Sequence, residues 1–350
     1  MRESLRNILL PFSALYGGVV FIRNLGYDNG IFRVSKLPVP VVSVGNISVG
    51  GSGKTPFTMF LVERFLSMGK RPAVLSRGYR RLTNELVMAC PGRGDEADVQ
   101  MIGDEPALIS MNYPDVPVAV HADRHRAGME VLSKYGADVF ILDDGLQNRE
   151  LHRDLDFVLL RHPLPELTDY YLPAGDLRDS KRRIRRADVV VVTAHGTFDF
   201  AGGVSEQLRK YSDAPVAGVN YIASDLFDCL GAHHSFESVS GRKVVAFCGI
   251  ADPERFFESV DSLCNTTAVR KKYRDHHWYD EYDIDEVFEG EEDIVAVTTA
   301  KDAVRIFRDE ELSQLEEVRR IFAISEKTAV SFGEEHIDAA LDGIFRRVDA

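Results

Sequence analysis

Residues 39–58 read VPVVSVGNISVGGSGKTPFT, and their pattern indicates the fold class. An apolar, β-branched run at 39–44 is followed by a glycine-rich turn and then by a stretch with helical character. Gly50, Gly51 and Gly53 have no Cβ, so backbone N–H groups can turn inward around phosphate oxygens. The helix that follows adds the positive end of its dipole. A strand, a glycine-rich turn and a helix in this order predict a phosphate-binding loop.

Two side chains at the end of this loop have the chemistry that a nucleotide requires. Lys54 can reach the β- and γ-phosphates, and the hydroxyl of Thr55 can bind Mg²⁺. Ser48 stands where the pattern GxxxxGK[ST] has its first glycine. The alternative is a glycine-rich turn with a chance Lys-Thr pair, which the flanking strand and helix disfavour. We expect the nucleotide to be bound by Ser48, Gly50, Gly51, Ser52, Gly53, Lys54 and Thr55.

An acidic pair follows a second apolar run. Residues 137–149 read ADVFILDDGLQNR, which places Asp143 and Asp144 at a strand end. The carboxyl edge of a parallel strand faces the nucleotide crevice, and phosphoryl transfer needs a carboxylate near Mg²⁺. Adjacent residues of a strand point to opposite faces, so only one aspartate is expected to reach the metal. We choose Asp144, with Gln147 beyond it; the alternative is a solvated DDG turn.

Apolar runs and helical stretches alternate along the chain. Continuous runs such as VFIL and VVVV are typical of strands buried on both faces, and the alternation implies right-handed βαβ units. The predicted fold is therefore α/β: a P-loop NTPase-type, mostly parallel sheet with helices on both faces, plus a second, smaller α/β lobe. The expected domains are an N-terminal helix at 1–30, a core at 31–215 and the second lobe at 216–350. Strands are expected at 39–44, 71–75, 116–121, 137–142, 155–160, 188–193, 243–247, 294–298 and 320–324, and helices at 54–68, 124–134, 253–262 and 300–307.

Composition excludes several classes of protein. The 350 residues are 45% hydrophobic and 28% charged, which is ordinary for a globular chain. The net charge of −13 argues against a nucleic-acid partner. The four cysteines are scattered and form no CxxC pair, which argues against a disulfide framework or a zinc site. No obligate protein partner is expected.

The N-terminus carries an uncharged, mostly apolar run at residues 8–22, ILLPFSALYGGVVFI. The run is short for a bilayer span, and Pro11, Gly17 and Gly18 weaken it as a straight one. A signal peptide is disfavoured because the phosphate loop needs cytosolic nucleotide. We favour a helix that lies in the membrane interface. The alternative is a helix buried against the domain.

A basic run lies at residues 178–188, RDSKRRIRRAD, with six bases and two acids. Two interpretations are equally favoured. The run is either a solvated helix face or a contact with anionic headgroups or with the phosphate of a substrate.

The chain resembles the tetraacyldisaccharide 4′-kinases, or lipid A 4′-kinases, along nearly its whole length. The resemblance implies an enzyme that moves the γ-phosphate of ATP, with Mg²⁺, onto the 4′-hydroxyl of a lipid A disaccharide 1-phosphate. It also implies an enzyme on the cytoplasmic face of the inner membrane of a Gram-negative bacterium, with its active site in the cleft between two lobes. The segments that match in order are SVGNISVGGSGKTP at 43–56, SRGYRR at 76–81, GDEP at 103–106, ADR at 122–124, ILDDGLQNR at 141–149, LPAGDLRD at 172–179, FCGIADPERF at 247–256, DHH at 275–277 and TTAKDAVR at 298–305.

The resemblance also implies roles for single residues. Asp104 and His276 match a catalytic aspartate–histidine pair, and Arg178 matches an active-site arginine. Lys54 and Thr55 match the phosphate and magnesium residues, while Asp144 and Gln147 match the metal-side segment. Beside this resemblance, a histidine base oriented by a carboxylate suits the activation of a sugar hydroxyl. His277 is the less favoured histidine, and Lys301 either acts at the cleft or is a surface lysine.

Three positions depart from the family's pattern. Leu146 and Asn148 stand where DDGFQH is usual, and Asp179 stands where LRE is usual. The alternative function is a nucleotide-driven switch or maturation factor that acts on a protein partner. Guanine-specific switches carry an NKxD-type segment, and the sequence has none.

Overall fold

The computed structural model describes residues 3–198, 203–265, 267–289 and 293–346. Its contacts divide the chain into two compact units. The first unit consists of Met1–Arg77, Val116–Ile222 and Thr328–Ala350, and the second of Gly78–Asp115 and Ala223–Lys327. This division differs from the predicted boundary near residue 215. Residues 78–115 leave the first unit and return to it, and the last part of the chain also belongs to the first unit, so neither unit is continuous in sequence.

The first unit is built on a parallel sheet with the strand order β8-β7-β6-β1-β5-β2-β4. β1 lies between β5 and β6, and Val42 is in register with Ile141 on one side and with Leu155 on the other. Its strands are β1 (Val41–Asn46), β2 (Pro72–Ser76), β4 (Val118–Val120), β5 (Val139–Asp143), β6 (Leu155–Arg161), β7 (Val189–His195) and the start of β8 (Val216–Phe227). Its helices are α1 (Glu3–Asp28), α2 (Lys54–Ser67), α5 (Arg124–Lys134), α6 (Val204–Leu208) and α10 (Glu334–Arg346), with 3₁₀ turns η2 (Pro165–Leu167) and η3 (Lys181–Arg186).

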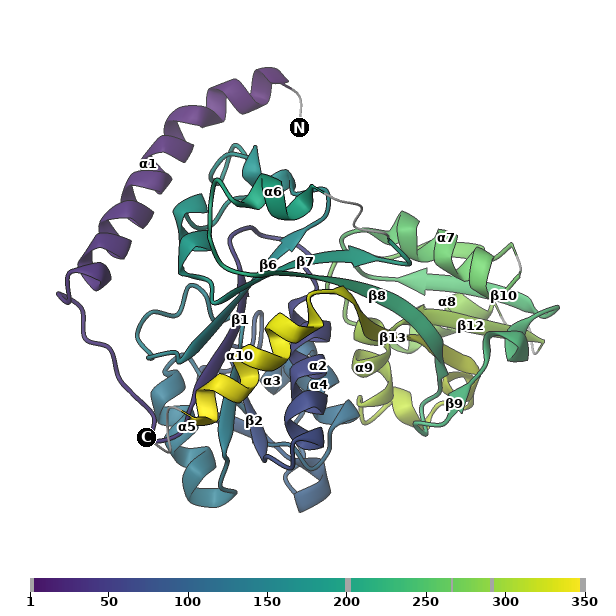
Figure 1. The fold of residues 1–350 in the computed structure, drawn as a ribbon. Coiled ribbons are helices and arrows are strands. Elements are labelled where there is room, and N and C mark those ends of the chain that lie inside the picture. Colours follow the sequence, from purple (N-terminus) through teal and green to yellow (C-terminus); the bar gives the residue numbers. More distant parts are fainter. Residues whose placement is uncertain (1–2, 199–202, 266, 290–292, 347–350) are drawn as a thin grey trace. The chain divides into compact units, whose positions relative to one another are not determined.

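Both faces of this sheet are covered, as the continuous apolar runs predict. On one face, Val158 of β6 packs in a cluster that includes Ile184 of η3 and Val204 of α6. On the other face, the ring of Phe157 lies 5.3 Å from that of Phe57 on α2. Figure 1 shows β1 and β6 in the middle of this unit with α2 and α10 against the sheet. The carboxyl ends of the strands therefore emerge from a fully buried sheet, which fixes the loops that follow them.

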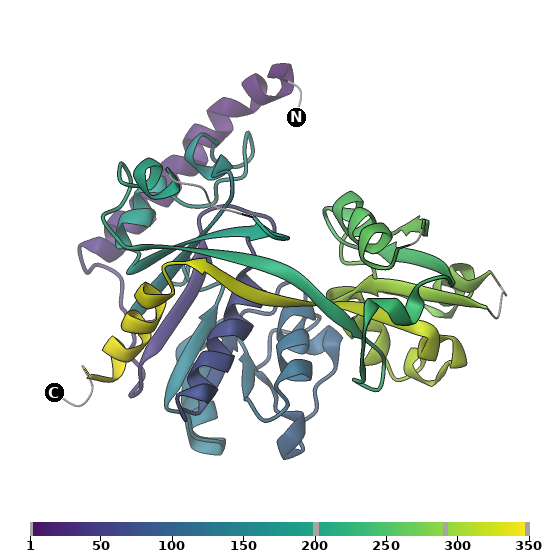
Figure 2. The ribbon, with the colours of Figure 1, turned by 45° about the vertical axis from the view of Figure 1, so that its right-hand side comes forward.

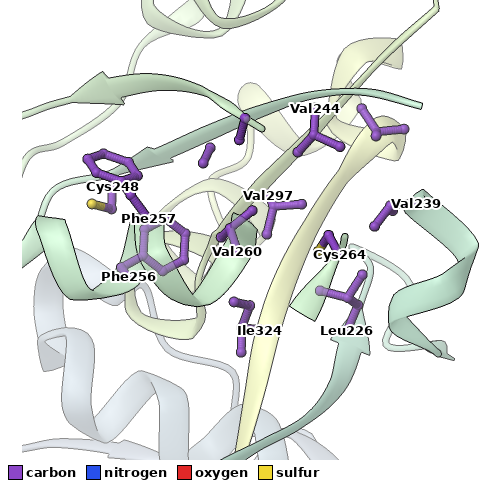
Figure 3. Packing of buried hydrophobic residues seen from close by; sticks show 13 residues of the cluster. Leu226, Val239, Val244, Cys248, Phe256, Phe257, Val260, Cys264, Val297 and Ile324 are labelled. Atoms are coloured by element: carbon purple, nitrogen blue, oxygen red, sulfur yellow. The ribbon is translucent and has the colours of Figure 1, made fainter. Parts of the chain in front are cut away.

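The second unit is a smaller α/β layer with the parallel strand order β11-β10-β12-β13. Phe256 and Phe257 of α7 pack with Val297 of β12 and Ile324 of β13 in a closed apolar cluster (Figure 3). Its strands are β3 (Val87–Ala89), β9 (His233–His234), β10 (Lys243–Cys248), β11 (Val269–Lys272), β12 (Ile294–Thr299) and most of β13 (Ile321–Phe332). Its helices are α3 (Val99–Ile102), α4 (Asp104–Asn112), α7 (Pro253–Leu263), α8 (Glu281–Phe288) and α9 (Ala300–Phe307), with 3₁₀ turns η1 (Pro91–Arg93), η4 (Phe236–Val239), η5 (Leu312–Gln314) and η6 (Glu316–Arg320).

The long strand β8 lies where the sequence suggested only a boundary. Residues 216–227 read VAGVNYIASDLF, which mixes apolar, glycine and polar residues and so has no clear strand pattern. The strand carries the chain out of the first unit, and β13 carries it back. Both appear as long ribbons in Figure 2.

Helix α1 runs without a break through Pro11 and the Gly17–Gly18 pair, so these residues do not interrupt it. One of its faces contacts the rest of the first unit. The hydroxyl of Ser13 donates to the carbonyl of Tyr171 at 2.6 Å, and a Cβ on Gly17 would lie 2.8 Å from the ring of Tyr171. The helix is long and apolar enough to cross a membrane by length and composition. Its other face exposes large apolar side chains: Ile8, Phe12, Leu15, Val19, Phe21, Ile22 and Leu25. Residues 1 and 2 of the predicted 1–30 segment lie outside the described residues.

Candidate active site

The loop between β1 and α2 has the backbone shape that a phosphate-binding loop requires. Gly50 and Gly53 adopt positive φ angles of 98° and 72°, and Gly53 caps the start of α2. A Cβ on Gly53 would lie 2.0 Å from the ring of Tyr221, whose hydroxyl donates to the carbonyl of Gly53 at 2.7 Å. Only glycine fits this position. Gly50 and Gly51 are exposed at the tip of the loop, where a ligand can approach their N–H groups.

Two serines anchor the base of the loop. Ser52 is buried, and its hydroxyl accepts a hydrogen bond from the Nδ2 of Asn46 at 2.7 Å. Ser48, which replaces the first glycine of the motif, is also buried and donates to Oε1 of Glu166 at 3.2 Å. Its backbone is not in the left-handed region, so the turn forms there with a serine. Ser48 and Ser52 thus support the loop from within, and the glycines form its exposed tip.

Lys54, Asp144 and Arg178 form a charged group at this loop. Lys54 is the first residue of α2, and its Nζ lies 3.6 Å from Oδ1 of Asp144. Arg178 donates to both carboxylate oxygens of Asp144, at 2.8 Å to Oδ2. Burial disfavours the charged carboxylate, but the charges of Lys54 and Arg178 outweigh this and lower the pKa of Asp144 to about 2. Asp144 is therefore an anion at neutral pH.

The two adjacent aspartates point in different directions, as strand alternation predicts. Asp143 ends β5, and its Oδ1 accepts a hydrogen bond from the buried hydroxyl of Thr58 at 3.1 Å. Asp144 follows with a positive φ of 52° and faces Lys54. The geometry singles out Asp144 as the carboxylate at the phosphate loop.

The oxygen atoms around this loop suit a magnesium ion. Thr55 offers a hydroxyl, Asp144 a carboxylate and Gln147 an amide oxygen, and Mg²⁺ prefers oxygen ligands. The Oε1 of Gln147 is buried and has no hydrogen-bond partner among the described residues. Within the described ranges no three His, Cys, Asp or Glu side chains gather to hold a metal. Mg²⁺ usually takes one or two carboxylates and completes its shell with phosphates and water, so the donor set fits.

Asn46 is a residue of this group that the sequence analysis did not single out. It ends β1 and is fully buried. Its Oδ1 accepts a hydrogen bond from Arg178, and its carbonyl accepts one from the Nε2 of Gln147 at 2.7 Å. Its position as the last residue of the strand before the loop was the available signal.

In the second unit, Asp104 and His276 form a direct pair. Asp104 is the first residue of α4, and its Oδ2 lies 2.7 Å from the Nδ1 of His276. Burial disfavours the charged form of Asp104, but the hydrogen bonds from His276 and Arg305 and their charges hold its pKa well below the usual range. Because the ionised carboxylate accepts the proton of Nδ1, the lone pair of the ring is left on Nε2. This arrangement can remove a proton from a hydroxyl group.

The neighbouring histidine faces elsewhere. The Nε2 of His277 lies 2.7 Å from Oδ2 of Asp283, and its ring stacks on that of Tyr273 with centroids 4.8 Å apart. Lys301 is half-exposed and its Nζ lies 2.7 Å from Oε1 of Glu105. His277 and Lys301 are thus held by partners of their own, outside the Asp104–His276 pair.

Arg305 is a buried residue at this pair that the sequence analysis missed. It is 2% exposed and donates to Oδ2 of Asp104 and, at 3.0 Å, to Oδ1 of Asp302. Asp302 and Arg305 both lie in the segment TTAKDAVR at 298–305, three positions apart on α9. That spacing was the available signal, because residues i and i+3 are neighbours on a helix.

The departures from the family pattern have structural roles. Leu146 is fully buried, in close contact with Gly45. The side chain of Asn148 accepts a hydrogen bond from the N–H of Leu151 at 3.2 Å. Asp179 is fully buried, and its Oδ1 accepts a hydrogen bond from the Nδ2 of Asn24 on α1 at 2.9 Å.

The basic run is neither a uniform solvated face nor a uniform headgroup contact. Arg183 is buried, and burial and the neighbouring arginines lower its pKa to about 10, although Asp179 opposes this. Arg186 donates to Asp28 at the end of α1. Arg182 and Arg185 are exposed. Arg182 and Arg185 are thus open to an anionic surface, while Arg178, the first residue of the run, lies at the phosphate loop beside Asp144.

The chain is similar to known proteins over nearly its whole length. The family model described as Tetraacyldisaccharide-1-P 4′-kinase matches residues 5–346. A tetraacyldisaccharide 4′-kinase from Aquifex aeolicus is 37% identical over 306 residues, which cover 86% of this chain and 90% of that protein. Another from Chlorobium limicola is 33% identical over 350 residues, covering 98% and 99%. The crystal structure of LpxK from Aquifex aeolicus in complex with ATP is similar with a TM-score of 0.80 and 34% identity, covering 97% of this chain and 99% of that one.

Proposed function

The chain belongs to the tetraacyldisaccharide-1-P 4′-kinase family, and we infer that it transfers the γ-phosphoryl group of ATP to the 4′-hydroxyl of a tetraacyldisaccharide 1-phosphate. The observation that supports this reaction most directly is the charged group at the phosphate loop. Lys54 and Arg178 place two cations beside Asp144, next to glycines that can turn N–H groups toward phosphate oxygens. Phosphoryl transfer depends mainly on such positioning and charge neutralisation.

The residues in and around the loop divide the work of binding ATP and Mg²⁺ in this proposal. The N–H groups of Gly50, Gly51 and Gly53 and the Nζ of Lys54 bind the β- and γ-phosphates. Arg178 neutralises negative charge on the γ-phosphoryl group and keeps Asp144 oriented. Thr55, Asp144 and Gln147 would hold Mg²⁺, which neutralises phosphate charge when bound. Ser48 and Ser52 keep the loop in shape.

The proton of the acceptor hydroxyl goes to His276. Its Nε2 takes the proton as the 4′-oxygen bonds to the γ-phosphorus and the bond from that phosphorus to the β,γ-bridging oxygen of ATP breaks. ADP leaves with the bridging oxygen, and the product is the 4′-phosphate. Asp104 holds the Nδ1–H and stabilises the imidazolium that forms, which is the usual role of a carboxylate behind a histidine base.

Substitution of His276 and of Asp104 tests the transfer of the proton from the acceptor hydroxyl. His276→Ala and Asp104→Asn should each lower kcat by about 100-fold or more, the usual contribution of a general base, and leave the KM for ATP within a few-fold. Transfer of ³²P from labelled ATP to the lipid acceptor measures both constants. His277→Ala is the matched control and should retain most of the activity. Normal turnover in His276→Ala would remove this residue from the mechanism.

Helix α1 supports a place for the enzyme at a membrane. Its exposed apolar face fits the interfacial region of a bilayer, and the acceptor of this family is a lipid. We place the enzyme at the cytoplasmic surface of the inner membrane of a Gram-negative bacterium, where ATP and the lipid acceptor meet. Hydrolysis of ATP without transfer to the lipid would favour a nucleotide-driven switch instead.

A further inference from the structure

Two fully buried charged side chains of the second unit take no part in the reaction as described so far. Arg305 is 2% exposed and Asp302 is 0% exposed, and both lie on α9. Burial of a charged pair costs several kcal/mol per ion unless hydrogen bonds satisfy it, and apolar residues fill such a space at least as well. A buried pair beside a proposed base therefore calls for a reason other than stability.

Arg305 touches both members of the aspartate–histidine pair. Its Nη2 donates to Oδ2 of Asp104 and lies 3.3 Å from the Nδ1 of His276. Its Nη1 donates to Oδ1 of Asp302 at 3.0 Å and to the carbonyl of His277 at 3.1 Å. The planar guanidinium thus fixes the carboxylate of Asp104 in one orientation and also holds the backbone next to the base.

Asp302 is anchored from several sides. Its carboxylate accepts the N–H of Gly249 at 3.1 Å and 3.2 Å, the hydroxyl of Tyr279 at 3.0 Å and the hydroxyl of Thr299 at 2.6 Å. Thr299 caps the start of α9 and Tyr279 is 6% exposed. With Arg305, both oxygens of this buried carboxyl group have hydrogen-bond donors, which fixes its position.

Gly249 connects Asp302 to the base by a second route. Its N–H binds Asp302, and its carbonyl accepts the backbone N–H of His276 at 3.0 Å. A Cβ at this position would lie 2.8 Å from the carbonyl oxygen of Arg274 and 3.2 Å from Asp302, so only glycine permits the approach. His276 itself has a positive φ of 62°, a conformation that costs free energy in a residue with a Cβ and needs outside support.

We propose that Asp302 and Arg305 are positioning residues that hold His276 from two sides and so aim its Nε2 at the acceptor hydroxyl. One side is the chain Asp302–Arg305–Asp104–Nδ1, which sets the plane of the ring. The other is the peptide of Gly249, which sets the backbone. The proposal rests on the proposed role of His276 as the base.

The decisive test compares Arg305→Gln in two backgrounds. In the otherwise unchanged enzyme the substitution should lower kcat by about 10- to 100-fold, within the range of general-base catalysis, with the KM for ATP within twofold. In the His276→Ala background it should change the remaining rate by less than about twofold, because a residue that acts through His276 has nothing left to position. A structural role would lower the rate by the same factor in both backgrounds, and that result would overturn the proposal.

Further variants provide a control, a conservative substitution and a fallback for this test. Arg308→Gln, at the residue that follows α9 as its C-cap, is the matched control and should leave kcat within twofold. Arg305→Lys keeps the charge but cannot bridge Asp104 and Asp302 as a fork does, so it should restore only part of the rate. If Arg305→Gln does not fold, Tyr279→Phe removes one hydrogen bond from Asp302 and should lower kcat several-fold at an unchanged KM for ATP. A normal kcat in Tyr279→Phe would then overturn the proposal, whereas normal turnover in His276→Ala alone would overturn the assignment of the base.

Discussion

Asp144 is the carboxylate at the phosphate loop that pairs with two cations, Lys54 and Arg178. The adjacent acids in ILDDGLQNR and the alternation of strand residues are enough to predict one aspartate at the loop. The structure adds what the sequence could not contain: the two cations that hold it, one of them from residue 178. Asn46, Asp302 and Arg305 had only weak local signals, the end of a strand and an i,i+3 spacing on a helix, because the contacts that make them site residues depend on the tertiary fold.

The depressed pKa of Asp144 predicts how the stability of the protein depends on pH. The pKa is about 2 in the folded protein against an ordinary 3.8, so the unfolded chain binds the proton more tightly. The ion pairs therefore stabilise the fold above about pH 4, and this contribution is lost as the pH falls toward about 2. Asp144→Asn should show a smaller loss of Tm than the unchanged protein over this range.

The exposed Asp213, in the same unit, provides the control for this measurement. Asp213→Asn should follow the unchanged protein at every pH when Tm is measured by calorimetry. Parallel curves for Asp144→Asn and the unchanged protein would show that the ion pairs at the loop do not stabilise the fold.

At the scale of elements, apolar runs located most of the described strands within a few residues but only about half of the helices: α3, α4, α6, α8 and α10 were not predicted. β5 and β7 contain the continuous apolar runs VFIL and VVVV, and β1 and β6 are mostly apolar. All four were predicted because strands of a sheet covered on both faces are rich in apolar residues. β8 was not, because residues 216–227 follow no single periodicity. Because β8 was not predicted, the role of Tyr221 was not predicted either: this strand residue contacts Gly53 and so shapes the phosphate loop.

Helix α1 makes a testable element-scale prediction about the membrane. Leu15 and Val19 lie on its exposed face, and each large apolar side chain that leaves water contributes about 2 kcal/mol. The double substitution Leu15→Asp, Val19→Asp should lower binding to vesicles of phosphatidylethanolamine and phosphatidylglycerol on the order of 100-fold or more, measured by co-sedimentation.

The control for α1 uses exposed side chains of the second unit. Leu230 and Tyr282 are 85% and 75% exposed, so Leu230→Asp, Tyr282→Asp removes a similar apolar surface elsewhere. This control should bind vesicles as the unchanged protein does, and all variants should keep the same Tm. Equal binding by both double variants would refute an interfacial role for α1.

At the scale of the whole molecule, the sequence predicted two α/β parts but not how the chain is divided between them. Length and alternating elements suggested one cut near residue 215. In the structure each unit is instead made of separate segments: residues 78–115 belong to the second unit, and residues 328–346 belong to the first. One sequence cannot predict this division, because the hydrophobic pattern of a segment indicates its secondary structure but not the part of the chain against which it packs. The residues to which we assign the reaction are divided between the units: Lys54, Asp144 and Arg178 belong to one, Asp104 and His276 to the other.

Lys54 is proposed to bind the terminal phosphates of ATP, and the rate of ³²P transfer from ATP to tetraacyldisaccharide 1-phosphate by Lys54→Ala measures that contribution. Removal of this cation from the phosphate loop should lower kcat/KM by about 100-fold or more, because phosphoryl transfer depends on charge neutralisation at the γ-phosphoryl group. A rate within a few-fold of the unchanged enzyme, in a variant with an unchanged Tm, would contradict the account.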